Sequence, residues 1–248
     1  MGRVEGKVAL ITGGASGLGA EDARVLAREG AKIVITDVQE ELGRSVAAQI
    51  PDALFLKHDV RDEGRWAEVV AATLARFGRL DVLVNNAGLV RFANVEVMSY
   101  ADFKLQTEVM LDGTFLGCKA AIPHMTKGGG GSIINMSSVA ALKGIGVLPA
   151  YSAAKGGIIA MTRSIAVHCQ EQGYKIRVNA LTPGGHDTPM TQQALRELSP
   201  TSAGLDQIQN QGQGKPEDVA NLVLFLASEE SRQITGTYMT IDNGETMA

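Results

Sequence analysis

The sequence predicts one α/β domain with a doubly wound, parallel sheet of seven strands, a Rossmann-like fold. Short apolar runs alternate with longer stretches of helical periodicity, which is the order that repeated strand–helix–strand units require. The apolar runs are nearly continuous, so each predicted strand is expected to be buried on both faces. A glycine-rich turn stands directly between the first run and the first helical stretch, where such folds bind dinucleotides.

The predicted elements follow one another in a regular order. Strands rich in Val, Ile and Leu are predicted at residues 8–11, 33–36, 53–56, 82–84, 133–136, 176–181 and 238–241. Helices long enough to serve as right-handed crossovers are predicted at residues 18–29, 63–77, 100–125, 150–170 and 216–227. Residues 185–214 are rich in Gln, Gly, Ser and Thr, which favours a mobile flap over the strand ends; a plain surface excursion is the alternative.

Composition limits the classes of function. The 248 residues, 45% hydrophobic and 20% charged, are typical of a single globular domain, and a formal net charge of −4 gives no footprint for nucleic acid. Cys118 and Cys169 are too few for a disulfide scaffold and lack metal-ligand spacing, so we expect core or helix-face residues and no metal site. No apolar stretch is long enough to span a membrane and no signal sequence is recognisable, so a cytoplasmic location is expected.

The turn after the first strand has the spacing Gly13-x-x-x-Gly17-x-Gly19, with Ser16 and Leu18 between the glycines. Glycines let the backbone approach a pyrophosphate, and the start of the following helix offers free N–H groups to its charge. We therefore expect these five residues to contact a dinucleotide cofactor. The spacing differs by one residue from the commoner pattern, and a tight corner without a ligand is the alternative.

Asp37 closes the second predicted strand, eighteen residues beyond Gly19. A carboxylate at this place accepts hydrogen bonds from a ribose diol and repels a 2′-phosphate. The pattern therefore favours NAD as the cofactor. The alternative is an aspartate on a solvent-exposed turn.

Tyr151 and Lys155 lie four residues apart in a stretch without helix breakers, so one helical turn places them on one face. A nearby cation lowers the pKa of a phenol, which predicts a group that exchanges protons near neutral pH. Ser138, thirteen residues before Tyr151, is a candidate to hydrogen-bond the same substrate oxygen. Taken singly, Ser138 is equally well a turn residue and Lys155 a solvated helix lysine.

Together these motifs resemble the short-chain dehydrogenase/reductase family, and the resemblance extends over nearly the whole chain. It implies an NAD-dependent homotetrameric oxidoreductase with Ser138, Tyr151 and Lys155 as catalytic residues, the last two also touching the cofactor. It adds as cofactor contacts Asp59 and Val60 at the adenine, Asn86, Ala87 and Gly88 in the cleft, and Pro183, Gly184 and Thr188 at the nicotinamide. Within the family, the chain looks most like bacterial hydroxysteroid and cyclic-alcohol dehydrogenases.

The expected reaction moves a hydride between a carbinol carbon and the nicotinamide, while Tyr151 exchanges the proton on oxygen. The family's geometry implies that Phe92, Leu142 and Leu148 contact the substrate beside Ser138 and Tyr151. Because these walls are apolar, we expect a hydrophobic secondary alcohol, alicyclic or steroid-like, and its ketone.

Two other functions stay open. One is a 3-oxoacyl thioester reductase on the same scaffold. Such reductases mostly use NADPH and carry a basic residue where this chain has Ser16 or Val38. The other is a redox sensor that binds the dinucleotide without turnover.

Met110 and His186 depart from the family pattern. Met110 stands where the family has an asparagine that anchors a proton-relaying water, which a thioether cannot hold in the same way. On a regular helix Gln106 and Thr114 share its face, so either is a candidate replacement; a core-filling role and a nearly inactive enzyme are the alternatives. His186 is either a solvated bystander or a contact of the cofactor or substrate.

Overall fold

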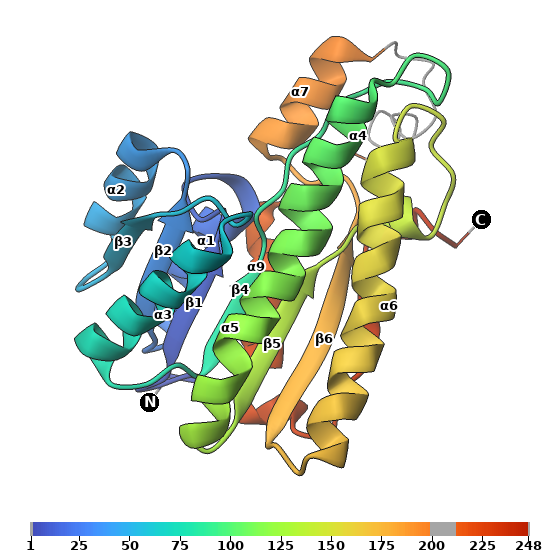
Figure 1. Ribbon diagram of the computed structural model, residues 1–248. Coiled ribbons are helices and arrows are strands. Elements are labelled where there is room, and N and C mark those ends of the chain that lie inside the picture. Colours follow the sequence, from blue (N-terminus) through green and yellow to red (C-terminus); the bar gives the residue numbers. More distant parts are fainter. Residues whose placement is uncertain (1, 199–211, 248) are drawn as a thin grey trace.

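The computed structural model describes residues 2–198 and 212–247 as one α/β domain with helices on both faces of a central sheet (Figure 1). The sheet has seven parallel strands in the order β3-β2-β1-β4-β5-β6-β7. The strands are β1 (Val8–Thr12), β2 (Lys32–Asp37), β3 (Leu54–Lys57), β4 (Val82–Asn85), β5 (Gly131–Met136), β6 (Ile176–Pro183) and β7 (Tyr238–Ile241). The predicted seven-stranded, doubly wound fold is confirmed.

The helices connect the strands as crossovers. They are α1 (Gly17–Arg28), α2 (Glu40–Ala48), α3 (Glu63–Phe77), α4 (Tyr100–Thr107), α5 (Gly113–Lys127), α6 (Pro149–Glu171), α7 (Pro189–Glu197) and α9 (Pro216–Ala227). A π-helical segment, η1 (Glu108–Asp112), joins α4 to α5, and 3₁₀ turns lie at η2 (Val139–Ala141) and η3 (Glu229–Ser231). Helices α2 and α7 are not among the predicted helices. The helix predicted over residues 100–125 is confirmed as one helical run over residues 100–127, in which the segment η1 is π-helical.

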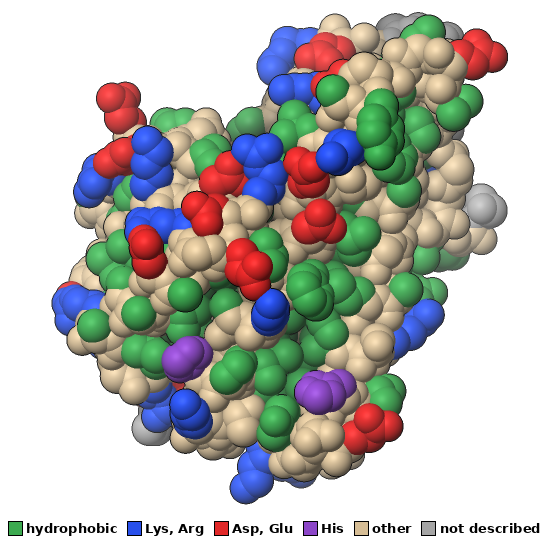
Figure 2. Space-filling view, in the orientation of Figure 1, with side chains coloured by type: hydrophobic (Ala, Val, Ile, Leu, Met, Phe, Trp, Pro, Cys, Tyr) green, Lys and Arg blue, Asp and Glu red, His purple; other side chains and the backbone are tan. Residues whose placement is uncertain are grey.

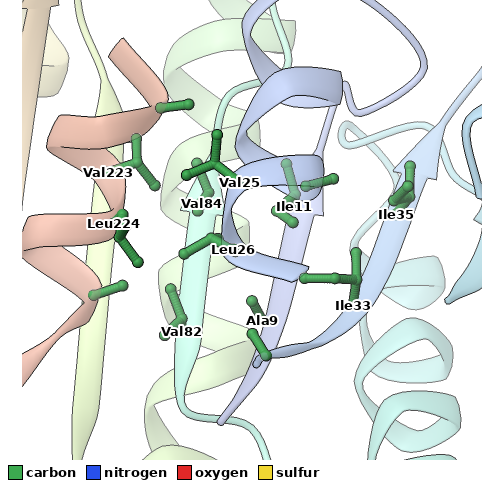
Figure 3. Close-up of a cluster of buried hydrophobic side chains, with 14 of the residues drawn as sticks. Ala9, Ile11, Val25, Leu26, Ile33, Ile35, Val82, Val84, Val223 and Leu224 are labelled. Carbon is green, nitrogen blue, oxygen red and sulfur yellow. The ribbon is translucent and has the colours of Figure 1, made fainter. Parts of the chain in front are cut away.

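Alternate residues of the strands build two hydrophobic layers, because successive side chains point to opposite faces of a sheet. On one face, Ile11 packs with Leu26 of α1 and Leu224 of α9 (Figure 3). On the other face, Leu10 packs with Trp66 of α3 and with residues of α5 and α6. Both faces of β1 are therefore buried, as its continuous apolar sequence predicts.

Cys118 and Cys169 are buried free thiols, in agreement with their expected place in the core. Both belong to the layer between the sheet and helices α3, α5 and α6.

Among the residues that the structure describes, no helix is both long enough and apolar enough to cross a bilayer.

The strand order reverses between β1 and β4, since the chain first proceeds outward to β3 and later from β4 outward to β7. Loops that leave the carboxyl ends of such neighbouring strands diverge and open a crevice. Asn86 connects the two sides of this crevice. Its side-chain amide donates hydrogen bonds to the carbonyl oxygens of Thr12 (3.0 Å) and Gly13 (3.1 Å) at the end of β1. The fold therefore positions a binding site at this edge of the sheet.

Asp22 is a polar exception in the core. It lies on α1, is fully buried, and within the described residues neither carboxyl oxygen has a hydrogen-bond partner. Burial, and to a smaller extent Glu21, raises the pKa of this carboxyl well above its usual value. The folded protein therefore keeps a proton on Asp22 that the unfolded chain releases above about pH 4.

The contribution of Asp22 to stability is expected to fall as pH rises above about 4, because the unfolded state then binds fewer protons than the folded state. Asp22→Asn keeps the shape and removes this titration. Chemical denaturation at about pH 5 and about pH 8 is expected to show a stability gain for Asp22→Asn that grows with pH. Exposed Glu41→Gln on α2 controls for replacing an acid by an amide. A gain equal at both pH values would contradict the prediction.

Candidate active site

The carboxyl ends of the central strands open into a cleft of about 810 Å³. It brings together residues that are far apart in the sequence. The predicted site residues that line it are Gly13, Ser16, Gly17, Leu18, Asp37, Asp59, Val60, Asn86, Ala87, Gly88, Ser138, Tyr151, Lys155, Pro183, Gly184 and Thr188. Gly19 is not part of this lining; a side chain there would collide with the Asn86 amide and the Gly13 carbonyl oxygen, so this glycine allows the close approach of α1 to both residues.

The glycine-rich turn joins β1 to α1 along one wall of the cleft. Gly13 (φ +63°) and Gly17 (φ +55°) adopt the left-handed region that favours glycine, and a Cβ on Gly13 would lie 2.8 Å from the Ala87 Cα. Ser16 precedes α1 in an extended conformation, and its side chain makes no capping hydrogen bond in the described structure. The first N–H groups of α1 are therefore available to an anion, and the dipole of the helix favours one.

Asp37 ends β2 beside this turn and is only 8% exposed, so the alternative of a solvent-exposed turn aspartate is wrong. Its two oxygens accept backbone hydrogen bonds from Ala15 N (3.1 Å) and Gln39 N (2.9 Å). These bonds hold the carboxylate in one orientation at the edge of the cleft. Val38, directly after it, is 57% exposed and adds no positive charge.

The segment after β3 forms the far end of the cleft. Asp59 is bound by the guanidinium group of Arg61, which holds the pKa of the Asp59 carboxyl below its usual value. His58 packs edge-on against Trp66 with the ring centroids 4.5 Å apart, and burial lowers the pKa of His58 to about 4. Val60 also lines the cleft. This end is therefore built from a neutral imidazole, an apolar side chain and a charge-paired carboxylate.

Lys155 lies one helical turn after Tyr151 near the start of α6 and is only 3% exposed, so the alternative of a solvated lysine is wrong. Its Nζ donates a hydrogen bond to the carbonyl oxygen of Met136 at the end of β5 (2.6 Å). The same Nζ is 5.5 Å from the centre of the Tyr151 ring. Burial lowers the pKa of Lys155 to about 7.

The Tyr151 phenol departs from the sequence expectation. Burial raises the pKa of Tyr151, and the Ser138 side chain, through a hydrogen bond, opposes this shift. The expected lowering by Lys155 is wrong for this protein without cofactor, because the Lys155 ammonium group is directed to the Met136 carbonyl and the phenolate is poorly solvated. Ser138 itself caps η2, since its Oγ accepts a hydrogen bond from Ala140 N (3.2 Å). The turn role and the site role of Ser138 are therefore compatible.

An apolar cluster surrounds the Tyr151 ring. It consists of Val90, Ala140 and Leu148 with Phe92, Ile145, Val147, Tyr151 and Met190. Two of the three apolar side chains expected at the substrate, Phe92 and Leu148, belong to it. Leu142, the third, lies outside the cluster and is 39% exposed.

The segment after β6 closes the cleft on the side of Pro183 and Gly184. His186 is 4% exposed and its Nδ1 is 3.0 Å from the Gly184 carbonyl oxygen, so the alternative of a solvated bystander is wrong. His186 also forms an isolated parallel bridge with Gly214. Within the predicted flap, residues 189–197 form α7, while residues 199–211 lie outside the described part. The mobility of the flap stays a prediction.

Met110 lies in the π-helical segment η1 and is completely buried against Ala154 and Ile158 of α6. The regular helix expected around Met110 is π-helical over Glu108–Asp112, which changes the spacing of side chains, while Gln106 and Thr114 are buried like Met110. Gln106 accepts a hydrogen bond from Arg91 N (3.1 Å), and Thr114 donates one to the Met110 carbonyl oxygen (2.7 Å). Both candidate substitutes already have partners in the protein, which favours the core-filling role of Met110.

Similarity to known proteins agrees with this geometry. The family described as enoyl-(acyl carrier protein) reductase matches residues 13–246. The chain is 42% identical to the 3-beta-hydroxysteroid dehydrogenase of Comamonas testosteroni, over 97% of this chain and 96% of that protein. The chain belongs to the short-chain dehydrogenase/reductase family.

The names of two further relatives in the family refer to alicyclic substrates. The chain is 43% identical to trans-4-hydroxycyclohexanecarboxylate dehydrogenase of Sinomonas cyclohexanicum, over 98% of this chain and 94% of that protein. It is 39% identical to cyclopentanol dehydrogenase of Comamonas sp. strain NCIMB 9872, over 99% of both. As an oxidoreductase of this family, the protein uses a nicotinamide dinucleotide. The left-handed glycines, the uncapped start of α1 and the oriented Asp37 carboxylate fit such a molecule.

Two contacts of this short-chain dehydrogenase/reductase site have no direct signal in the sequence. The Met136 partner of Lys155 is a backbone carbonyl, for which no side chain gives a signal. Met190 is the second residue of α7, and its sulfur atom is 3.9 Å from the Tyr151 hydroxyl oxygen. Met190 lies within the predicted flap, but several other apolar residues do too, so the sequence does not single it out.

Proposed function

We propose that this protein is an NAD-dependent dehydrogenase that interconverts a hydrophobic secondary alcohol, alicyclic or steroid-like, and its ketone. One observation carries the proposal. Tyr151 lies both in the lining of the dinucleotide cleft and in an apolar cluster, so a proton-exchanging hydroxyl is surrounded by apolar side chains suited to contact a ring. The names of the relatives, which include a hydroxysteroid, a cyclohexane and a cyclopentanol dehydrogenase, support the substrate class.

When bound, NAD supplies the carbon that accepts the hydride. Tyr151 takes the hydroxyl proton of the alcohol, and Ser138 donates a hydrogen bond to the same oxygen. Lys155, whose pKa is lowered to about 7 by burial, binds the ribose of the cofactor, and the phenolate form of Tyr151 is favoured when positively charged NAD is bound. The apolar cluster keeps water from the reacting carbon and positions the ring.

The rest of the cleft holds the cofactor in this proposal. Gly13, Ser16, Gly17 and the first turn of α1 bind the pyrophosphate, and Asp37 accepts hydrogen bonds from the adenosine ribose. The remaining proposed contacts are Leu18, Asp59 and Val60 near the adenosine, Asn86, Ala87 and Gly88 along the cleft, and Pro183, Gly184 and Thr188 at the nicotinamide.

A direct test mixes the protein with NAD and a panel of cyclic and charged hydroxy compounds and follows the absorbance of the reduced cofactor. Oxidation of cyclopentanol or a hydroxysteroid, with little activity on small hydroxy acids, supports the proposal. A higher rate for NADPH with a 3-oxoacyl thioester than for any ring alcohol would refute it.

Replacing Tyr151 by phenylalanine removes only the oxygen that exchanges the proton, so it is expected to lower kcat by ~10²–10⁴. NAD affinity, measured by titration calorimetry, is expected to stay nearly unchanged. Tyr100→Phe removes a phenolic hydroxyl from a 75% exposed residue of α4 and is the matched control. If Tyr151→Phe kept more than about a tenth of the rate, the proton would have another acceptor.

Cofactor choice is expected to depend on the residues that end β2. NAD is preferred because Asp37 repels a 2′-phosphate and Val38 supplies no cation. In the double variant Asp37→Ser, Val38→Arg, the repulsion is replaced by a charge-assisted bond. The ratio of kcat/KM with NAD to kcat/KM with NADP is expected to fall at least about tenfold. This corresponds to a change of ~1.4 kcal/mol in the free-energy difference that discriminates the two cofactors. Equal kinetics with both cofactors in the unmodified protein would contradict the role of Asp37.

We further propose a homotetramer. Figure 2 shows hydrophobic side chains gathered over α5 and α6, and a groove there is lined by Phe115, Ile122, Pro123, Ile165 and Tyr174. Phe115 is 49% exposed, and pairing with the same face of a second copy would bury it. Light scattering at micromolar concentration is expected to give four times the chain mass, and Phe115→Glu a smaller assembly. A monomer mass for the unmodified protein would refute this arrangement.

A further inference from the structure

The first turn of α7 places the Met190 side chain over the candidate catalytic tyrosine. The Tyr151 hydroxyl is 3.9 Å from the Met190 sulfur, and Met190 packs into the same apolar cluster that surrounds the Tyr151 ring. We propose that Met190 occupies the substrate position as a displaceable side chain and thereby sets the size of ring that the site accepts. This inference rests on the proposed function and adds a specificity-determining residue to it.

The backbone beside Met190 is held in place, so its side chain is the part free to move. Pro189 fixes the first helical position of α7, and the Thr188 Oγ1 caps the helix by accepting a hydrogen bond from Thr191 N (3.2 Å). Thr188 also rests on the glycine-rich turn, since a Cβ on Gly17 would lie 3.5 Å from the Thr188 Cβ. The methionine side chain has three rotatable bonds and adapts readily to neighbours of different shape.

Replacing the Met190 side chain by a substrate is favourable both for the Tyr151 hydroxyl and for the apolar residues around it. A thioether sulfur is a weak hydrogen-bond acceptor, so a hydroxyl or carbonyl oxygen is a better partner for the Tyr151 hydroxyl. The ring of the substrate then contacts the apolar residues that Met190 leaves. These residues are Val90, Phe92, Ala140, Ile145, Val147 and Leu148.

Ring size determines how far Met190 must move. A single small ring fills a space similar to that of the methionine side chain, and Met190 then packs on its outer edge. A fused ring system extends further and needs the whole side chain to leave the cluster. Shortening Met190 therefore removes contacts from a small substrate and removes an obstacle for a large one.

Steady-state kinetics with cyclopentanol and a 3-hydroxysteroid test this assignment. In Met190→Ala, the ratio of kcat/KM for the steroid to that for cyclopentanol is expected to rise about tenfold or more. Met190→Leu keeps most of the volume and is expected to change the ratio much less. Met247→Ala, at an 88% exposed methionine, is the control. An unchanged ratio in Met190→Ala would overturn the proposal.

A second measurement does not need turnover. In protein labelled on its methionine methyl groups, the Met190 signal is identified by its loss in Met190→Leu. Adding cyclopentanol to the complex with reduced cofactor is expected to shift this signal and leave the Met247 signal in place. A fixed Met190 signal in a protein that oxidises cyclopentanol would overturn the role of Met190 and leave the proposed function standing. A shifted signal without turnover of any alcohol would refute the proposed function instead.

Discussion

The architecture of the site depends on one buried hydrogen bond, from the Lys155 ammonium group to the Met136 carbonyl oxygen (2.6 Å). A buried charge is costly unless it is hydrogen-bonded, and the pKa of Lys155, lowered to about 7, records that cost. The neighbouring Ser137 Oγ donates a hydrogen bond to the Lys155 carbonyl oxygen (2.8 Å). Two hydrogen bonds that involve Lys155 therefore connect the end of β5 to the start of α6. Tyr151, one turn earlier, is thereby fixed relative to the sheet.

A second buried network extends this connection toward the cofactor side. The Asn85 amide at the end of β4 donates to the Asn135 oxygen of β5 (2.9 Å), and the Asn135 amide donates to the Thr162 hydroxyl of α6 (3.0 Å). Asn86 follows directly and bonds the start of the glycine-rich turn. The residues proposed to hold the pyrophosphate and those proposed to exchange the proton therefore belong to one continuous polar framework, which limits their relative motion.

The sequence predicts those parts of the fold that leave a periodic apolar pattern. The strands are found because each contains a short, largely apolar run, although β6 also carries Arg177 and Asn179 and β7 is only partly buried. Helix α3 is found because Trp66, Val69 and Val70 form a buried stripe. Helix α7 has no fully buried residue and α2 has few, so neither gives such a stripe. The π-helical segment around Met110 adds one residue to a turn, which an average periodicity over residues 100–125 does not reveal.

The site is predictable where side chains carry the chemistry, as at Asp37, Tyr151 and Lys155, and less so where burial or backbone groups decide. The direction of the Tyr151 pKa shift depends on burial, which the spacing of Tyr151 and Lys155 does not show. The pH-dependent ultraviolet difference spectrum between wild type and Tyr151→Phe measures this pKa directly. We predict that Tyr151 ionises above the usual range of tyrosine in the free protein, and at lower pH once positively charged NAD is bound. Ionisation within or below the usual range in the free protein would contradict the account.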